Sequence, residues 1–293
     1  MMTGMKRGRP GVAYLAGAPL LLAHRGGAAL APENTLLAFR QAIEWWGADI
    51  LEIDVQPTRD GEVVVIHDES VDRTTDGRGA VADQSLSEIT ALDAGFRFTP
   101  DGGLTFPYRG QGVRVPTLQE VLDAFPDYRI NVEIKDGRAA RRAVEVIREA
   151  AAEARVLLAA GRRRDRLAAG WYPGATSAAE EELRAFYLLH RLRLARWYRP
   201  GIDALQLPHR HGGREVPTAR FVRDAHRLNL AVHVWTVDDA SDMVRLLSNG
   251  VDGIVTDRPD RLARVLHRHR RRPAPAGPPP EEMPPYLERL LLD

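Results

Sequence analysis

The sequence predicts an α/β fold, a (β/α)8 TIM barrel with an insertion after the second strand. Short apolar runs alternate with helix-like segments along most of the 293 residues, a pattern typical of βα units around a parallel sheet. The length suits one barrel of about 250 residues with short tails. Charged residues end several of the apolar runs, and the strand ends of such a barrel carry its active site.

The predicted strands are short runs rich in β-branched residues and leucine. Runs of this kind, bounded by turn residues, are consistent with strands buried on both faces. The eight runs are residues 20–23, 50–55, 129–134, 156–159, 175–178, 204–207, 230–235 and 253–256.

Helix signals follow most of these strands. Asn34 is expected to cap a helix that continues to about Trp46. Thr117 and Glu120 have the spacing of a capping box and predict a helix over 117–125. The remaining predicted helices cover 139–154, 180–197, 218–228, 240–249 and 261–269.

An irregular stretch, 58–115, separates the second and third barrel strands and is too long for an ordinary βα loop. It begins with the turn signal Asp60-Gly61 before a short strand at Val63. We expect an insertion at about 69–115, built over one end of the barrel. The predicted organisation is an N-terminal extension (1–18), the barrel (19–269) and a proline-rich C-terminal tail (270–293) that we expect to be mobile.

The composition limits the classes of partner and compartment. A net charge of +1 gives no reason to expect binding to nucleic acid or to an anionic membrane, and no apolar run is long enough to span a bilayer. The absence of cysteine excludes disulfides, zinc–thiolate sites and thiol catalysis, and fits a cytoplasmic protein. The N-terminal segment resembles a signal peptide, but Gly17 and Pro19 interrupt it, so its second half is predicted to be the first strand.

Three carboxylates indicate a metal site. Glu52 and Asp54 are two residues apart on one strand and so share a face, and Glu133 is near the end of the next barrel strand. Burying unpaired carboxylates costs several kcal/mol, so a compensating cation is expected. Ligands that offer only oxygen suit Mg²⁺ or Ca²⁺. The alternative is a buried ion network in which Glu133 pairs with Lys135 or Arg25.

Histidines and cations at neighbouring strand ends indicate phosphate-ester chemistry. His24 and His67 could serve as an acid/base pair, although a single histidine is more often structural. Arg25 offers a planar fork and Lys135 a point charge to a phosphate, unless Arg25 forms only a salt bridge. Trp235 could stack on a glycerol or choline-like head group, or pack in the core.

Several other polar residues have weaker claims. Asp68 could orient His67, although it is also a common turn residue. His209 and His211 follow the sixth barrel strand and would line the same mouth. His226 and His233 are interpreted as structural residues.

A series of motifs in this order resembles the glycerophosphodiester phosphodiesterase family over about residues 20–266. The motifs are His24-Arg25-Gly26-Gly27, Pro32-Glu33-Asn34-Thr35, Glu52-x-Asp54, Thr58-x-Asp60-Gly61, His67-Asp68, Pro116-Thr117-Leu118, Glu133-x-Lys135, Trp235-Thr236-Val237 and the run from Gly250 to Asp257.

The resemblance implies roles for these residues. His24 and His67 would be the acid/base pair. The metal ligands would be Glu52, Asp54 and Glu133, and the phosphate would be bound by Arg25 and Lys135. Family members hydrolyse deacylated phospholipids to glycerol 3-phosphate and an alcohol. The sequence departs from the family at residues 159–161, where Ala-Ala-Gly replaces the usual Ser-Phe, and this bears on substrate preference.

The leading prediction is therefore a cytoplasmic, divalent-metal-dependent phosphodiesterase acting on a small-molecule phosphodiester, without nucleic acid or stable membrane insertion. One alternative is a lysophospholipase D-like or phospholipase C-like activity on acylated lipids. That activity needs an apolar groove, which aromatic and leucine side chains of the insertion could supply unless they form the insertion's own core. These are Phe96, Phe98, Leu104, Phe106 and Tyr108. A second alternative is a non-catalytic ligand-binding barrel.

Overall fold

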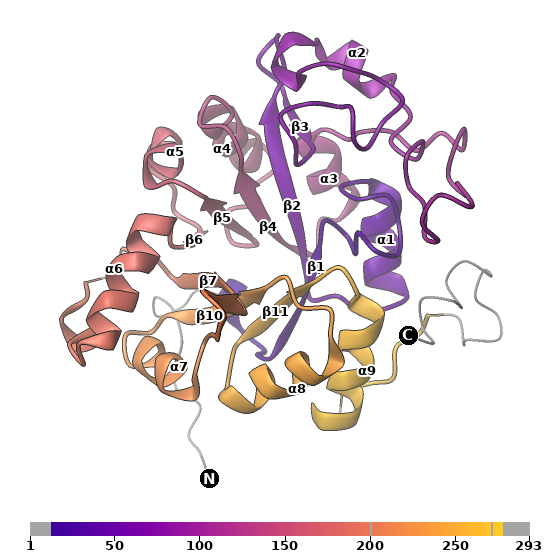
Figure 1. Cartoon of the computed structure of the whole chain (residues 1–293). Helices are drawn as coiled ribbons and strands as arrows, with labels where there is room; N and C mark the ends of the chain where they lie inside the picture. Colours follow the sequence, from indigo (N-terminus) through magenta and orange to yellow (C-terminus); the bar gives the residue numbers. More distant parts are fainter. Residues whose placement is uncertain (1–12, 200, 271, 278–293) are drawn as a thin grey trace.

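The computed structural model describes residues 13–199, 201–270 and 272–277 (Figure 1). Eight parallel strands form a nearly closed barrel in the order β6-β5-β4-β2-β1-β11-β10-β7, and a bridge between Ser177 and Ala204 joins its two edges. The predicted (β/α)8 fold is confirmed. The barrel strands are β1 (Leu20–His24), β2 (Ile50–Pro57), β4 (Arg129–Ile134), β5 (Val156–Ala160), β6 (Ala175–Thr176), β7 (Ala204–Pro208), β10 (Ala231–Trp235) and β11 (Gly253–Thr256).

The strand register brings the predicted site residues to one end of the barrel. His24 on β1 pairs with Glu52 on β2. Two residues further along β2, Asp54 pairs with Glu133 on β4. Because the strands are parallel, their carboxyl ends meet at the same mouth.

Helices surround the barrel, and several differ from their predicted bounds. They are α1 (Leu36–Glu44), α2 (Leu86–Thr90), α3 (Leu118–Ala124), α4 (Ala140–Glu149), α5 (Arg163–Ala168), α6 (Glu180–Arg191), α7 (Ala219–His226), α8 (Ala240–Asn249) and α9 (Pro259–Arg270), with 3-10 turns η1 (Ala13–Leu15), η2 (Val81–Asp83) and η3 (Ala195–Trp197).

The predicted cap of α1 was wrong by one residue. Thr35 is the N-cap, and its side chain accepts a hydrogen bond from the backbone N–H of Ala38. Asn34 has a φ of 58°, outside the range of an N-cap, and its side chain points to Asp54 instead. The capping box of α3, from Thr117 and Glu120, was predicted correctly.

The N-terminal end of the barrel is closed by η1. Tyr14 and Leu15 are buried in an apolar cluster with interior residues such as Leu20 and Leu157. The Arg129 guanidinium on β4 holds this segment by donating to the backbone oxygen of Tyr14 at 2.9 Å. The described part of the predicted extension therefore contributes to the barrel core.

The irregular stretch 58–115 contains β3 (Val63–Val65), which pairs antiparallel with β2 and precedes the predicted insertion. It has its own core, in which side chains such as Val71, Ile89 and Tyr108 are buried. Phe98 packs against this core, with its ring 5.5 Å from the ring of Tyr108. This stretch, marked by β3 and α2, lies on the opposite side of the barrel from α6 (Figure 1).

Two segments lie outside the barrel strands and their helices. A hairpin of β8 (Arg210–His211) and β9 (Arg214–Glu215) follows β7. The start of the proline-rich tail lies against α1, where the Gly277 backbone N–H donates to the Trp45 oxygen at 2.7 Å. Residues 278–293 of that tail lie outside the described residues. Within the described ranges, every helix is too short or too polar to cross a membrane.

Candidate active site

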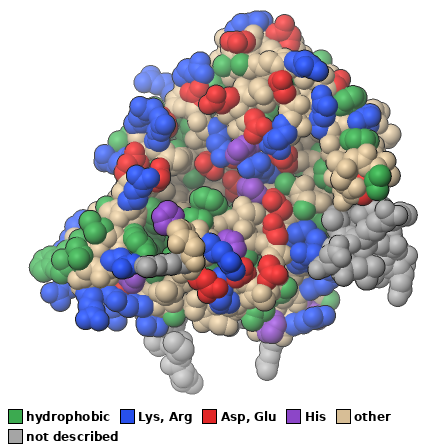
Figure 2. Space-filling model, in the orientation of Figure 1, with side chains coloured by type: hydrophobic (Ala, Val, Ile, Leu, Met, Phe, Trp, Pro, Cys, Tyr) green, Lys and Arg blue, Asp and Glu red, His purple; other side chains and the backbone are tan. Residues whose placement is uncertain are grey.

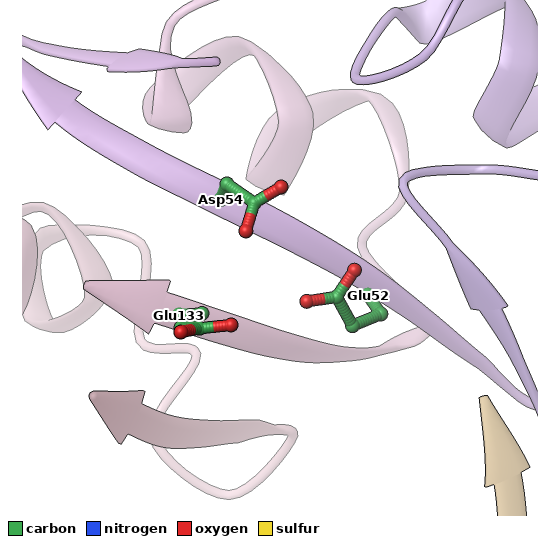
Figure 3. Close-up of side chains that lie close together, drawn as sticks. All are labelled: Glu52, Asp54 and Glu133. Atoms are coloured by element: carbon green, nitrogen blue, oxygen red, sulfur yellow. The ribbon is translucent and has the colours of Figure 1, made fainter. Parts of the chain in front are cut away.

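Three carboxylates converge at the barrel mouth. Glu52 and Asp54 project from β2 and Glu133 projects from β4 toward the same space (Figure 3). One carboxylate oxygen of each lies within 4.8 Å of the others. Glu52 and Asp54 are buried, as expected for side chains on an interior strand.

Two cations compensate only part of this negative charge. Arg25 Nε lies 3.1 Å from Asp54 Oδ2, and Lys135 Nζ lies 3.0 Å from Asp54 Oδ1 and 3.1 Å from Glu133 Oε2. Glu52 instead accepts the backbone N–H of Arg25 at 3.1 Å. The ion pair between Glu133 and Lys135, considered as the alternative to a metal site, is thus present, whereas Arg25 pairs with Asp54.

The pKa directions show where negative charge remains uncompensated. Burial tends to raise the pKa of Asp54, but the charges of Lys135 and Arg25 outweigh it and hold the pKa below its usual value. Burial and the neighbouring Asp54 charge raise the pKa of Glu52. Ionised Glu52 therefore needs a further positive charge. Three oxygen donors at this spacing, with a surplus of negative charge, fit a divalent cation such as Mg²⁺ or Ca²⁺.

His24 is held by a carboxylate that the sequence analysis did not single out. His24 Nδ1 lies 2.6 Å from Asp257 Oδ1. Burial tends to lower the pKa of His24, but the hydrogen bond to Asp257 and the charge of Glu52 outweigh it and raise the pKa to about 9. Asp257 follows β11 directly, so the rule that strand ends carry the active site could have found it.

His67 belongs to a chain of ion pairs between the insertion and the barrel. His67 Nδ1 lies 2.6 Å from Asp68 Oδ1, and Arg73 Nε lies 2.6 Å from Asp68 Oδ2. Arg73 also binds Glu33 at 2.7 Å, and Glu33 in turn binds Arg25 at 2.9 Å. Hydrogen bonds from Arg73 and His67 lower the pKa of Asp68 to about 2. The orienting role predicted for Asp68 matches this geometry.

Glu33, Asn34 and Arg73 are parts of the site that sequence reasoning missed. Asn34 was assigned to the helix cap, which Thr35 provides, and Glu33 was noted only as part of the motif Pro32-Glu33-Asn34-Thr35. The Asn34 side-chain amide donates to Asp54 Oδ2 at 3.0 Å, and so fixes the orientation of this proposed metal ligand. No spacing in the sequence indicates Arg73, which lies in the irregular insertion. Charged and histidine side chains gather at the centre of this face of the molecule (Figure 2).

A pocket of about 560 Å³ extends the site on the side away from the insertion. It begins at Glu133 and passes small residues on β5 before reaching α6. Trp235, 44% exposed, forms part of its wall, so this tryptophan lies at the mouth rather than in the core. The lining residues are Glu133, Ala159, Ala160, Gly161, Ser177, Ala178, Glu180, Leu183, Arg184, Tyr187, Gln206, Leu207, Pro208, His211, Val216 and Trp235.

The apolar groove is therefore not where the sequence analysis sought it. Among the described residues, none of the insertion's aromatic side chains lines this pocket. Phe96 and Phe106 stack on the guanidinium of Arg109, with ring centroids 4.2 and 3.9 Å from its central carbon. Leu104 is exposed to solvent. The groove is instead formed by α6 and the ends of β5, β7 and β10.

Four further histidines were considered in the sequence analysis, and only one of them lines the pocket. His211 lines the pocket, whereas His209 Nδ1 lies 3.4 Å from Asp242. His226 binds Asp252 at 2.8 Å and His233 is fully buried in the barrel, consistent with structural roles for both.

Comparison with known proteins agrees with this geometry. The model of the glycerophosphoryl diester phosphodiesterase family matches residues 24–261. A glycerophosphodiester phosphodiesterase of Caldanaerobacter subterraneus subsp. tengcongensis is 35% identical over 267 residues, covering 85% of this chain and 98% of that relative. A probable glycerophosphodiester phosphodiesterase 2 of Mycobacterium tuberculosis is also 35% identical, over 88% of this chain and 95% of the relative.

Solved structures support the fold. The glycerophosphoryl diester phosphodiesterase domain of a Mycobacterium tuberculosis protein superimposes with a TM-score of 0.76 at 23% identity, covering 86% of this chain and all of that domain. An Oleispira antarctica phosphodiesterase in complex with its product sn-glycerol-3-phosphate has a TM-score of 0.62 at 24% identity, over 85% of this chain and 97% of that one. The family match spans most of the chain and includes every proposed site residue. The chain is therefore a phosphoric diester hydrolase and belongs to the glycerophosphoryl diester phosphodiesterase family.

Proposed function

We propose that this enzyme hydrolyses glycerophosphodiesters to glycerol 3-phosphate and an alcohol, using a divalent cation and two histidines. The observation that carries the proposal is the convergence at one barrel mouth of three carboxylates with two histidines, each held by an aspartate. The Oleispira antarctica relative, whose structure contains the product sn-glycerol-3-phosphate, supports the choice of product.

The carboxylates Glu52, Asp54 and Glu133 would hold the cation, either Mg²⁺ or Ca²⁺. When bound, the cation supplies positive charge that offsets the negative charge of the phosphodiester. Arg25 and Lys135 add a planar fork and a point charge at the same place, and both already lie within 3.1 Å of the carboxylate cluster. They are the proposed phosphate-binding residues, and Trp235 at the pocket mouth is the proposed contact for the remainder of the substrate.

His24 and His67 are the proposed acid/base pair. In each ring Nδ1 is engaged by an aspartate, so Nε2 is the nitrogen that exchanges a proton with the substrate. One histidine takes a proton from the attacking hydroxyl or water, and the other protonates the leaving oxygen. Asp257 and Asp68 hold the two rings in the orientations that these acid and base roles require.

The test is release of glycerol 3-phosphate from a panel of glycerophosphodiesters, with and without EDTA. We expect the purified full chain to release it, EDTA to abolish the activity, and Mg²⁺ or Ca²⁺ to restore it. Undiminished turnover after exhaustive chelation would contradict the metal assignment. A lack of release from every member of the panel would contradict the activity and favour a ligand-binding barrel.

The apolar pocket favours a second candidate, hydrolysis of an acylated lipid. Residues 159–161 place two alanines and a glycine where bulkier side chains would fill the space beside Glu133. Leu183, Tyr187 and Leu207 continue the apolar wall. A lysolipid chain is the kind of group that such a pocket accepts.

Filling the pocket distinguishes the two candidates. Gly161→Phe should lower turnover of lysolipids much more than turnover of glycerophosphodiesters, because Gly161 lines the pocket and a side chain there meets no atom within 4 Å of its Cβ. Phe106→Ser is the matched control, since Phe106 stacks on Arg109 in the insertion. Equal effects of Gly161→Phe on both substrate classes would show that the pocket does not select the substrate.

The proposed compartment is the cytoplasm, and the proposed partner at the active site is a small-molecule phosphodiester. The cysteine-free composition fits the first, because a chain without disulfides does not depend on an oxidising compartment for its stability. The pocket of about 560 Å³ at the barrel mouth, a size that suits a small ligand, supports the second.

A further inference from the structure

Exposed apolar side chains gather on one segment that contributes no residue to the carboxylate site. Of the eight large hydrophobic residues that are exposed in the described part of the chain, four lie within 188–197. They are Leu188, Leu192, Leu194 and Trp197, between 40% and 59% exposed. The segment covers the end of α6, the following turn and η3. Figure 2 shows hydrophobic side chains gathered on this flank, over α6 as Figure 1 places it.

A basic pocket lies beside these apolar residues. Four arginines, Arg193, Arg196, Arg220 and Arg227, line a cavity of about 580 Å³ together with one acid, Asp224. Asp224 is already engaged, because it accepts from Arg227 at 2.9 Å and lies 2.8 Å from His190 Nδ1. The pocket therefore carries a surplus of positive charge.

Arginine beside exposed leucine and tryptophan is the chemistry of an interfacial membrane contact. Tryptophan and leucine side chains enter the boundary between head groups and acyl chains, while arginines bind lipid phosphates. We propose that segment 188–197 and the adjoining arginine pocket form a docking surface for a bilayer that contains anionic phospholipids. A free phosphate ion would use the arginines but would leave the four apolar side chains in water.

The docking surface and the active-site pocket share one helix, α6. The helix α6 also supplies Leu183, Arg184 and Tyr187 to the wall of the active-site pocket. A bilayer seated on the end of α6 would thus lie along the same helix that borders the substrate pocket. This consequence rests on the proposed function, whereas the docking itself does not, since vesicle binding is measured without turnover.

The experiment is co-sedimentation of the full chain with phosphatidylcholine vesicles that contain or lack phosphatidylglycerol. We expect binding to the anionic vesicles, little binding to the neutral ones, and weakening by high salt because salt screens the arginine charges. Arg193→Gln with Arg196→Gln should weaken binding by about 25-fold, from about fivefold for each lost charge. Leu192→Ser with Trp197→Ser should weaken it as well.

The matched control is Leu167→Ser with Trp171→Ser, which removes two exposed apolar side chains outside the docking surface. It should bind the anionic vesicles as the unmodified chain does. All variants should keep the unmodified melting temperature and turnover on a water-soluble substrate, because none of these residues lies at the carboxylate site.

Three results would overturn the proposal. The first is equal binding to neutral and anionic vesicles. The second is equal binding by the docking-surface variants and the control. The third is self-association that Trp197→Ser disperses in sedimentation velocity, because that result would make a second copy of the chain the occupant of the surface.

Discussion

Each proposed catalytic histidine has one ring nitrogen fixed by an aspartate, which leaves the other nitrogen for proton transfer. Removing the histidine side chain should therefore affect proton transfer more than substrate binding. We predict that His24→Ala and His67→Ala each lower kcat by about 10² to 10⁴, the usual contribution of a proton-transfer group. KM should change much less, because Arg25, Lys135 and the cation are assigned to hold the phosphate. Steady-state kinetics on a glycerophosphodiester measures both constants.

A substrate with an acidic leaving group separates the two roles. The nitrophenolate of a nitrophenyl phosphodiester departs without being protonated. This substrate should therefore partly rescue the variant that lacks the general acid and leave the other variant impaired. Failure to rescue either variant would mean that His24 and His67 position the substrate rather than transfer protons.

His233 has a different role, and its burial predicts an acid-sensitive fold. Burial and the charge of Arg129 lower the pKa of His233 to about 4, whereas an unfolded chain has the ordinary value near 6.5. Between these values the unfolded state binds the extra proton, so the free energy of unfolding should fall as the pH drops from about 6.5 to about 4. The full loss from this residue is about 3 kcal/mol.

Melting temperatures between pH 7 and pH 4.5 test this prediction. His233→Gln should show a shallower loss of stability with acid than the unmodified chain, whatever its stability at pH 7. His211→Gln, which replaces an exposed histidine, should keep the original slope. Identical slopes for all three proteins would contradict the assignment of acid sensitivity to His233.

At this scale the sequence predicts residues that end strands. Glu52, Asp54 and Glu133 converge because barrel topology brings all strand ends together. The alternation of strand-like and helix-like segments in the sequence predicts that topology. Asn34 and Arg73 could not be predicted in this way. Their partners, Asp54 and Glu33, lie 20 and 40 residues away, and only the folded chain brings them into contact.

Among the elements, η1 shows how a short segment can stabilise the whole barrel. Tyr14 fills the N-terminal end of the barrel, and its side chain is fully enclosed. We predict that Tyr14→Ala lowers the free energy of unfolding by about 3 to 5 kcal/mol, the usual cost of removing a buried aromatic ring. Denaturant unfolding followed by circular dichroism measures the change.

Tyr14→Phe is the control for this prediction. The Tyr14 hydroxyl has no hydrogen-bond partner among the residues that the structure describes, so its removal should leave stability unchanged or slightly raised. A large loss in Tyr14→Phe, or no loss in Tyr14→Ala, would show that ring packing does not hold this end of the barrel closed.

Helices and insertions are less predictable than strands, for local reasons. The predicted helix over 180–197 ends at Arg191, because Arg193 adopts a φ of 62° and the chain turns before η3. The short α2 has a capping box from Ser85 and Glu88, but it lies in the irregular stretch where no apolar period indicated a helix. The hydrophobic period locates an element more securely than its ends.

For the molecule as a whole, net charge conceals the distribution of charge. The chain carries only +1, which gave no reason to expect an anionic membrane as partner. Four arginines nevertheless line the pocket beside η3, while three carboxylates converge at the barrel mouth. The fold class was predictable because alternation extends along the whole chain, whereas the apolar pocket and the docking surface depend on which side chains meet in space.

The central claim is that the three carboxylates hold the cation that the phosphodiesterase reaction needs. The most direct measurement is titration of Mg²⁺ into the chelator-treated chain, followed in parallel by calorimetry and by release of glycerol 3-phosphate. Both signals should rise together in the unmodified chain and in Glu62→Gln, which replaces a partly exposed carboxylate that pairs with Arg142 outside the site. Glu52→Gln should keep the fold but lose both metal affinity and activity, as removal of one ligand requires. Full activity before any Mg²⁺ is added, or unchanged metal affinity in Glu52→Gln, would contradict the claim.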